Sequence, residues 1–192
     1  MTPSLETRRL LLRPPELADA AQVQILFPHW EIVRYLAGPV PWPYPPDGAH
    51  KFYRDVALPA VERGEQWYWT LRLKERPEQL IGSINLVRGP VTNRGFWIGL
   101  PWQRQGLMTE AAETVTDYWF DVLKFPVLRV PKAIPNTASR RISEKNGMRI
   151  VATAMREYVS GPALTEIWEI TAREWHVHRS QRHAAERSSN RL

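Results

Sequence analysis

The feature that most constrains the fold is a helical pattern that begins at residue 107, directly after a polar turn. Its apolar residues recur at steps of three and four and so form one stripe along a helix: Leu107, Ala111, Val115, Tyr118 and Val122. The turn ends at Gly106. A helix that starts there presents unpaired backbone N–H groups and the positive end of its dipole, which together favour an anion. The sequence therefore predicts a helix whose first turn is either an anion site or only a connection.

The segments on both sides of this helix alternate between strand and helix patterns. Strands are expected at 5–13, 66–73, 79–87, 92–100, 127–130, 148–157 and 165–171, and further helices at 16–27, 31–36, 48–63 and 136–146. Pro131 follows the fifth strand and cannot donate a ladder hydrogen bond, so the sheet is expected to come apart there. The predicted fold is α/β (α+β): a mixed, mostly antiparallel sheet of about seven strands, with helices on both faces and strands four and five splayed.

Composition limits the classes of function. The chain of 192 residues is expected to form a single domain over 1–175, followed by a flexible basic tail over 176–192. The net charge is +6, and half of it lies in residues 173–192, so nucleic-acid binding is not predicted for the body of the chain. The absence of cysteine excludes disulfides and a thiol nucleophile. No signal peptide or membrane span is expected, and the default expectation is a cytoplasmic protein.

Phosphate-loop and metal motifs are absent. The sequence contains no GxxxxGK[ST], GxGxxG or HExxH pattern, so nucleotide-binding loops and a zinc site are not predicted. Residues 38–46 form a proline-rich aromatic loop. This loop either packs over the core or forms one wall of a substrate site, and the aromatic residues Trp42, Tyr44, Trp67 and Trp69 have the same two interpretations.

Two stretches in the second half of the chain carry a more specific signal. Residues 103–108 read QRQGLM and residues 136–148 read NTASRRISEKNGM. Together they resemble the GNAT superfamily of acetyl-CoA-dependent N-acetyltransferases, and most closely its RimJ/RimL branch. The first stretch matches a [QR]-x-x-G-x-[GA] motif except at Met108, and the second resembles the family's N-x-x-[AS] … E-K-x-G-[FM] helix. The opening 5–10 and residues 80–82 also look like this branch, so the resemblance covers about residues 5–175.

The resemblance implies an acetyl-CoA site. Backbone N–H groups from Arg104 to Thr109 would hold the pyrophosphate, and pantetheine would lie along the strand that ends near Leu100. Asn136 would either bind pantetheine or cap its helix. The implied cofactor-binding residues are Ile98, Gly99, Leu100, Gln103, Arg104, Gln105, Gly106, Leu107, Met108, Thr109, Asn136 and Ser139.

The candidate catalytic residues are Ser139, which the resemblance implies, and Glu166, which is considered because the position of the usual base is altered. Ser139 occupies the place of a serine thought to protonate the leaving thiolate, with positioning of the sulfur as its alternative role. The tyrosine that many members use four residues later is Ser143 here. The branch often has a glutamate base at the place of Asn93, which cannot accept a proton. Glu166 has two interpretations: it is either the alternative base or simply a solvated carboxylate on a strand.

The sequence thus favours an acetyl-CoA-dependent N-acetyltransferase that uses acetyl-CoA as co-substrate and no metal. Its acceptor would be a protein N-terminal α-amine or a small-molecule amine, and a homodimer is compatible with the sequence. The alternative is a non-catalytic acyl-CoA-binding or sensor protein on the same fold.

Overall fold

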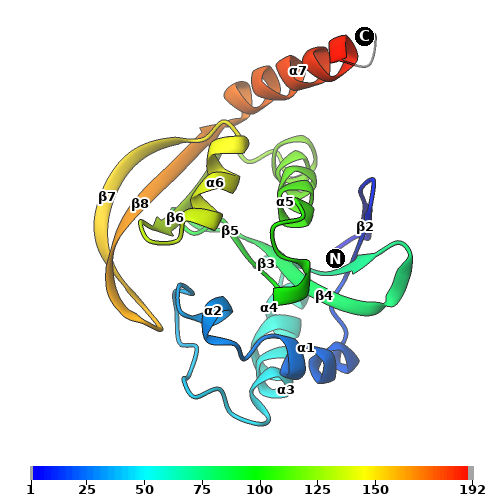
Figure 1. Cartoon of the computed structure of the whole chain (residues 1–192), viewed down its shortest axis with the longest axis vertical. Coiled ribbons are helices and arrows are strands. Elements are labelled where there is room, and N and C mark those ends of the chain that lie inside the picture. The colour runs from blue at the N-terminus through cyan, green and yellow to red at the C-terminus, as the bar shows by residue number, and fades with distance from the viewer. Residues whose placement is uncertain (1, 190–192) are drawn as a thin grey trace.

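The computed structural model describes residues 2–189, which contain two sheets (Figure 1). The larger sheet is antiparallel in the order β1-β2-β3-β4-β5, and the smaller is antiparallel in the order β6-β8-β7. The strands are β1 (Leu5–Glu6), β2 (Leu10–Arg13), β3 (Gln66–Leu73), β4 (Arg76–Val87), β5 (Arg94–Ile98), β6 (Val127–Ala133), β7 (Arg149–Tyr158) and β8 (Gly161–Thr171). The mixed α/β class expected from the sequence is confirmed.

Helices cover both faces of the larger sheet. The alternation of β3 directs Trp67 and Trp69 toward α5 and Tyr68 toward the N-terminal helices. The helices are α1 (Ala20–Leu26), α2 (Trp30–Val33), α3 (Gly48–Phe52), α4 (Leu58–Glu62), α5 (Leu107–Asp117), α6 (Thr137–Lys145) and α7 (Ala172–Ser189). Short 3-10 segments are η1 (Leu17–Asp19) and η3 (Leu100–Trp102), and π-helical segments are η2 (Tyr53–Ala57) and η4 (Tyr118–Val122). No helix in the described part of the chain is long and apolar enough to span a membrane.

Two apolar clusters hold these layers together. The larger lies between α5 and both sheets and includes Trp69, Trp119 and Val130. The smaller lies between β3–β5 and the N-terminal helices, where Phe27 contacts the rings of Tyr44 and Trp97 edge to face. The aromatic loop therefore packs Tyr44 over core, whereas Trp42 pairs with Trp30 and both stay partly exposed. Trp67 and Trp69 are core residues.

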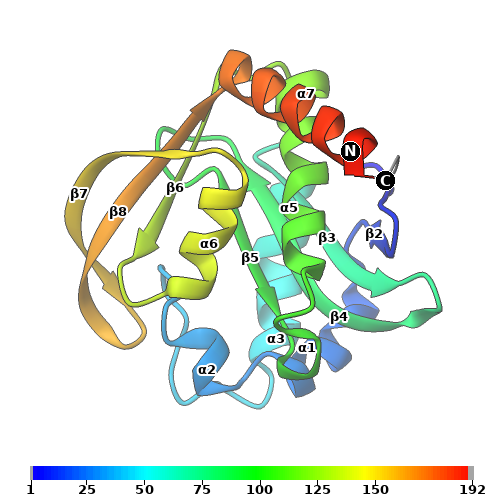
Figure 2. The same cartoon turned by 45° about the horizontal axis from the view of Figure 1, so that its top comes forward.

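The two sheets meet at β5 and β6, which diverge from a closed end. Two hydrogen bonds between Asn93 and Arg129 hold this end together, and we call this pair of bonds the clasp. The backbone N of Asn93 donates to Arg129 O, and Arg129 N donates to Asn93 Oδ1, both at 2.8 Å. The backbone N–H and C=O of Arg129 both point toward β5. Backbone groups alternate in direction along a strand, so those of Pro131, two residues later, also point toward β5. Pro131 has no N–H to offer, and the ladder stops. The splay expected at this proline is confirmed, and α6 lies over the diverging strands (Figure 2).

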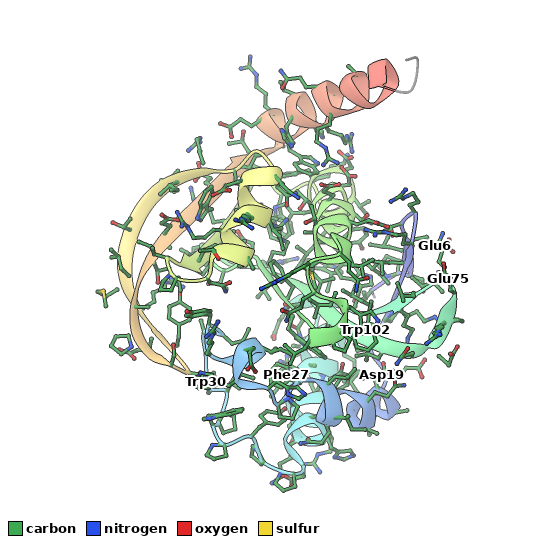
Figure 3. All side chains as sticks on the ribbon, in the orientation of Figure 1. Glu6, Asp19, Phe27, Trp30, Glu75 and Trp102 are labelled. Carbon is green, nitrogen blue, oxygen red and sulfur yellow. The ribbon has the colours of Figure 1, made fainter. Side chains whose placement is uncertain are left out.

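Two strand predictions are corrected. The expected strand 5–13 is a hairpin of β1 and β2, because Thr7 N bonds back to Leu10 O and reverses the chain. The expected strand 92–100 ends at Ile98, because Pro101 fixes its φ and the chain turns into η3. Trp102 from η3 packs on Gly99, and Figure 3 labels it beside the start of α5.

In place of the flexible tail expected from residue 176, the structure has helix α7, while residues 190–192 lie outside the described part. Trp175 is buried against α5 and donates from Nε1 to Asp117 Oδ1 at 2.9 Å. Arg179 forms ion pairs with Asp117 and Asp121. His178 lies on Gly147 and bonds to Lys145 O at the end of α6. Asp117 at the end of α5 and Asp121 in η4 thus pair with a basic residue of α7 that the sequence alone left unpartnered.

Trp175 is expected to anchor α7. Trp175→Ala removes a large buried side chain and leaves Asp117 with one donor fewer, so we expect a loss of about 3–5 kcal/mol in the free energy of unfolding. Urea unfolding measures this, with Val177→Ala as the matched control. Val177 lies on the same helix and is 51% exposed, so its truncation is expected to cost less than about 0.5 kcal/mol. Equal stabilities of the two variants would contradict the docking.

Candidate active site

The first turn of α5 forms a cradle of unpaired donors. Gly106 occupies the N-cap position in the left-handed region, with φ at 76°, and no side chain caps the helix. Arg104 also has a positive φ, of 60°. The first helical hydrogen bond runs from Glu110 N to Gly106 O at 3.1 Å, so the N–H groups of the three preceding residues have no helical partner. These groups and the helix dipole favour a phosphate at this point.

An arginine from the other end of the sequence lies beside this cradle. Arg9 donates from Nε to Glu110 Oε2 at 2.8 Å and from Nη1 to Gln105 O at 3.0 Å. Its Nη2 lies 3.6 Å from the position that a Cβ on Gly106 would occupy. Thr7 also bonds Glu110. The β1–β2 turn therefore fixes the first turn of α5 and adds a cation next to it. Sequence reasoning gave Arg9 no role, although the opening segment was part of the family resemblance.

The gap between β5 and β6 leads away from the cradle. Gly99 N donates to Ile81 O on β4, so the alternation of β5 turns the backbone groups of Phe96 and Ile98 toward the gap. Gln103 donates from Nε2 to Ile98 O at 3.2 Å. The predicted residues 98–100 and 103–109 follow one another from the end of β5 through η3 to the first turn of α5, with Leu100 in η3 rather than in a strand.

The second predicted stretch forms α6 on the other side of the gap. Asn136 caps this helix, with Oδ1 accepting from Ser139 N at 3.2 Å, so the predicted cap is confirmed. Ser139 is 7% exposed in the first turn. Ser143, at the place of the family's tyrosine, is fully buried and its Oγ has no hydrogen-bond partner within the described residues.

Neither candidate position for a base holds a free carboxylate. Asn93 is 2% exposed, and its amide donates to Val87 O and Gly89 O while its Oδ1 accepts from Arg129. Glu166 is not a solvated strand carboxylate. It is 7% exposed, receives two hydrogen bonds from Arg140 at 2.8 and 3.0 Å, and accepts a third from Trp168 Nε1. Both carboxylate oxygens of Glu166 are occupied by these donors, so the geometry does not offer Glu166 as a free base.

Two buried cations that sequence reasoning missed lie on β5 and β6, the strands that border the gap. Arg94 on β5 is 2% exposed and donates to Thr116 Oγ1 at 2.6 Å and Asn146 Oδ1 at 2.9 Å. Lys132 on β6 is 7% exposed, and its Nζ lies 4.5 Å from the centre of the Phe96 ring on β5. Among the described residues, neither cation forms an ion pair with a carboxylate. Burial, followed by the charge of Arg94, lowers the pKa of Lys132 to about 7, and burial lowers the pKa of Arg94 to about 10.

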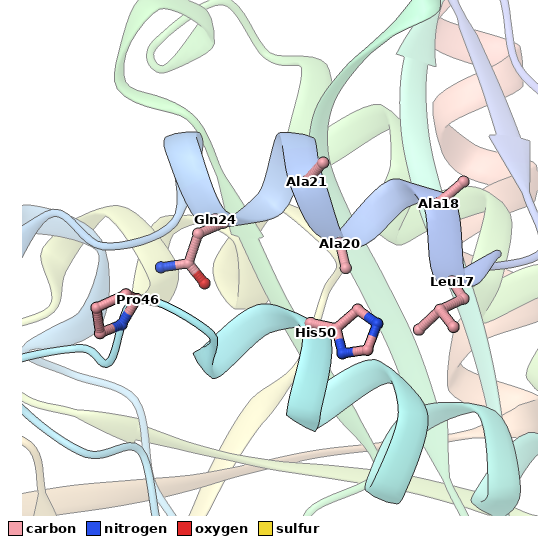
Figure 4. Close-up of a pocket in the computed structure, with 7 residues that line it drawn as sticks. All are labelled: Leu17, Ala18, Ala20, Ala21, Gln24, Pro46 and His50. Atoms are coloured by element: carbon pink, nitrogen blue, oxygen red, sulfur yellow. The ribbon is translucent and has the colours of Figure 1, made fainter.

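A separate hollow of about 570 Å³ lies between α1 and α3, on the opposite side of the larger sheet from α5 (Figure 4). Its lining is mainly apolar, and its polar groups come from Gln24 and His50. The amide of Gln24 already bonds Pro45 O and Ala49 N, so it holds α3 against α1. His50 is the remaining polar side chain in the lining, and one imidazole does not make the cluster of convergent polar groups that marks a site of chemistry.

The cradle, the gap and the second helix coincide with a known domain. Residues 9–149 match the family model of the acetyltransferase (GNAT) domain, which covers more than half of the chain. The chain belongs to the GNAT acetyltransferase family. A search of curated proteins gives no match.

Solved structures of GNAT proteins share the fold at low sequence identity. A ribosomal-protein-S5-alanine acetyltransferase from Vibrio fischeri is 14% identical with a TM-score of 0.74, over 90% of this chain and 98% of that one. RimJ from Mycobacterium smegmatis in complex with CoA-disulfide is 17% identical with a TM-score of 0.75, over 91% of each chain. The microcin C7 self-immunity acetyltransferase MccE, in complex with acetyl-CoA and AMP, is 15% identical with a TM-score of 0.72, over 85% of this chain and 93% of that one.

The buried amine of Lys132 is expected to make stability depend on pH. Its pKa is about 7 in the folded protein against 10.5 ordinarily, so the unfolded chain holds the extra proton between these values. Stability therefore rises as pH increases through this window. From pH 7 to 9, we expect the free energy of unfolding to rise by roughly 1–3 kcal/mol more in the wild type than in Lys132→Met.

Urea unfolding at both pH values measures this difference. Lys51→Met is the control, because Lys51 is an exposed lysine that pairs with Asp47 on the far side of the sheet. The control is expected to follow the wild type. An identical pH dependence in the wild type and Lys132→Met would contradict the buried, proton-poor state of Lys132.

Proposed function

We propose that this GNAT protein transfers the acetyl group of acetyl-CoA to a primary amine by direct attack of the amine on the thioester. The observation that carries the proposal is the continuity of the donor cradle at α5 with the gap between β5 and β6. The cradle fits a pyrophosphate, and the adjoining edge of β5 offers backbone groups for the amides of pantetheine.

The proposed binding roles follow from position. Backbone N–H groups from Arg104 to Thr109 would hold the pyrophosphate, and Arg9 would add charge at its side. The edge of β5 from Phe96 to Ile98 would pair with pantetheine, and Gln103 would release Ile98 O for this pairing. Ser139, in the first turn of α6, would contact the sulfur end of the arm.

The acceptor is proposed to be an α-amine of a protein N-terminus or a small amine of similar pKa. An α-amine with a pKa of about 7.7–8.0 is neutral in roughly a tenth of molecules at pH 7, whereas a lysine amine at about 10.4 is neutral in roughly one in 2,500. Asn93 is fully hydrogen-bonded and Glu166 is ion-paired, so the gap offers no free carboxylate to deprotonate an ammonium. A site without a strong base favours an acceptor that is already partly neutral.

The same absence of a free carboxylate supports a second candidate function, a protein that binds acyl-CoA without turnover. Both functions require CoA binding, and only the first releases CoA from acetyl-CoA. A panel of peptides with free N-termini and small polyamines, followed by mass spectrometry of the acetylated product, separates them. Acetylation of any member supports the enzyme, and tight acetyl-CoA binding with no product across the panel supports the second function.

Gly106→Glu is expected to abolish CoA binding, because the new side chain places bulk and a negative charge at the phosphate cradle. Isothermal titration with CoA measures the loss, which we expect to exceed a hundredfold in Kd, or about 3 kcal/mol. The matched control is Gly64→Glu. Gly64 also has a positive φ, of 69°, and open space around its Cβ position, so it reproduces the backbone strain away from the cradle.

Gly64→Glu is expected to bind CoA like the wild type. If Gly106→Glu bound CoA with wild-type affinity, the first turn of α5 would not be the phosphate site. An absence of CoA binding by the wild type at tens of micromolar would overturn the proposed function itself.

A further inference from the structure

Lys132 occupies a defined depth in the β5–β6 gap. The gap closes where Asn93 clasps Arg129, and both Phe96 and Lys132 lie three residues beyond this clasp on their strands. At about 3.3 Å per residue, their contact spans the gap about 10 Å from its closed end. The cradle lies beyond the opposite end of β5, so an arm that enters from the cradle reaches the Lys132–Phe96 contact last.

The environment of Lys132 leaves its amine without a counter-ion. Its cross-strand neighbour on β8 is Glu166, but that carboxylate is bound by Arg140 and Trp168. The facing strand supplies Arg94, a second cation, and α5 supplies Glu113, whose charge acts on Arg94. Buried charges in proteins are ordinarily paired, so two buried cations on the strands that border the open edge of β5 point to negative charge that arrives with a ligand or forms during the reaction.

We propose that Lys132 is the acid that protonates the CoA thiolate as it leaves, an inference that rests on the function proposed above. The sulfur lies at the end of the pantetheine arm remote from the pyrophosphate, which places it beside the Lys132 amine. Ser139 then positions the sulfur from α6 and does not act as the acid. The role touches the reacting atoms directly, which makes Lys132 a catalytic residue.

The proton balance of this step is complete. The acceptor amine forms the C–N bond, the C–S bond breaks, and its electron pair stays on sulfur. The ammonium of Lys132 gives one proton to sulfur, which yields CoA thiol and a neutral lysine. The acceptor nitrogen loses its proton to water, and Lys132 regains a proton from water when the products leave.

The acidity of Lys132 suits this transfer. Burial and the nearby Arg94 lower its pKa to about 7, so close to half of the amines carry the proton at neutral pH. A thiol has an ordinary pKa of about 8.5, so transfer from this ammonium to a thiolate is favoured roughly thirtyfold. A serine hydroxyl is a much weaker acid and offers no such preference.

The test needs no acceptor and uses the full chain with CoA itself. The ultraviolet absorbance of the thiolate reports the ionisation of the CoA thiol in the bound complex as pH is raised from about 7 to 9, within the range that brackets an ordinary thiol. In the wild type, Lys132 loses its own proton before the thiol does, so the bound thiol is expected to ionise near its ordinary pKa. Lys132→Arg keeps a permanent charge that cannot be given to sulfur, so it is expected to lower the pKa of the bound thiol by at least about one unit relative to the wild type.

Binding of desulfo-CoA separates this role from a structural one. Lys132→Met fills a similar volume and removes an unpaired buried charge, which proteins tolerate, so its desulfo-CoA affinity is expected to stay within about threefold of the wild type. Lys51→Met is the control for lysine removal. If the thiol ionises identically in the wild type and Lys132→Arg, or if Lys132→Met loses desulfo-CoA, the acid role is overturned while the proposed function stands. If the wild type binds no CoA, both fall.

Discussion

The structure depends on the point where two strands stop pairing. Asn93 supplies a backbone N–H and a side-chain oxygen to Arg129, and this clasp joins the two sheets at one end. The next residue of β6 that faces β5 is Pro131, which has no N–H to continue the ladder. One clasp and one missing donor therefore create an open strand edge inside the protein. A buried strand edge demands hydrogen-bond partners, and a ligand with amide groups supplies them.

The helices α5 and α6, which flank the open edge of β5, supply the other groups of the candidate site. Gly106 and Arg104 adopt left-handed backbone conformations that turn the chain from β5 into α5 with its N–H groups uncapped. The Arg9–Glu110 pair then ties this turn to the N-terminal hairpin. On the other side, Asn136 caps α6 and brings Ser139 to the same opening. The site is thus assembled from backbone groups held in place by side chains, rather than from a cluster of catalytic side chains.

The charges in the gap have an unusual distribution. The position where the family often has a glutamate holds an amide that closes the sheet, and the remaining carboxylate, Glu166, is bound by Arg140. Arg94 and Lys132 are buried instead, and they contact amide, hydroxyl and aromatic groups. The gap is therefore electropositive at its closed end. Such an environment stabilises negative charge on a leaving sulfur and gives little help in removing a proton from the acceptor.

The sequence by itself determined the local features. The spacing of Leu107, Ala111 and Val115 fixed a helix, Gly106 fixed where it begins, and Pro131 fixed where the sheet divides, because each depends on neighbours in the chain or on the chemistry of one residue. Only the tertiary structure decided which groups are free. Arg9 reaches α5 from about a hundred residues away, Arg140 takes the carboxylate of Glu166, and α7 docks through Trp175 rather than fraying. The burial of Lys132 beside Arg94 was also decided only by the tertiary structure. Desolvation and ion pairing depend on contacts between strands, and no local sequence pattern specifies these contacts.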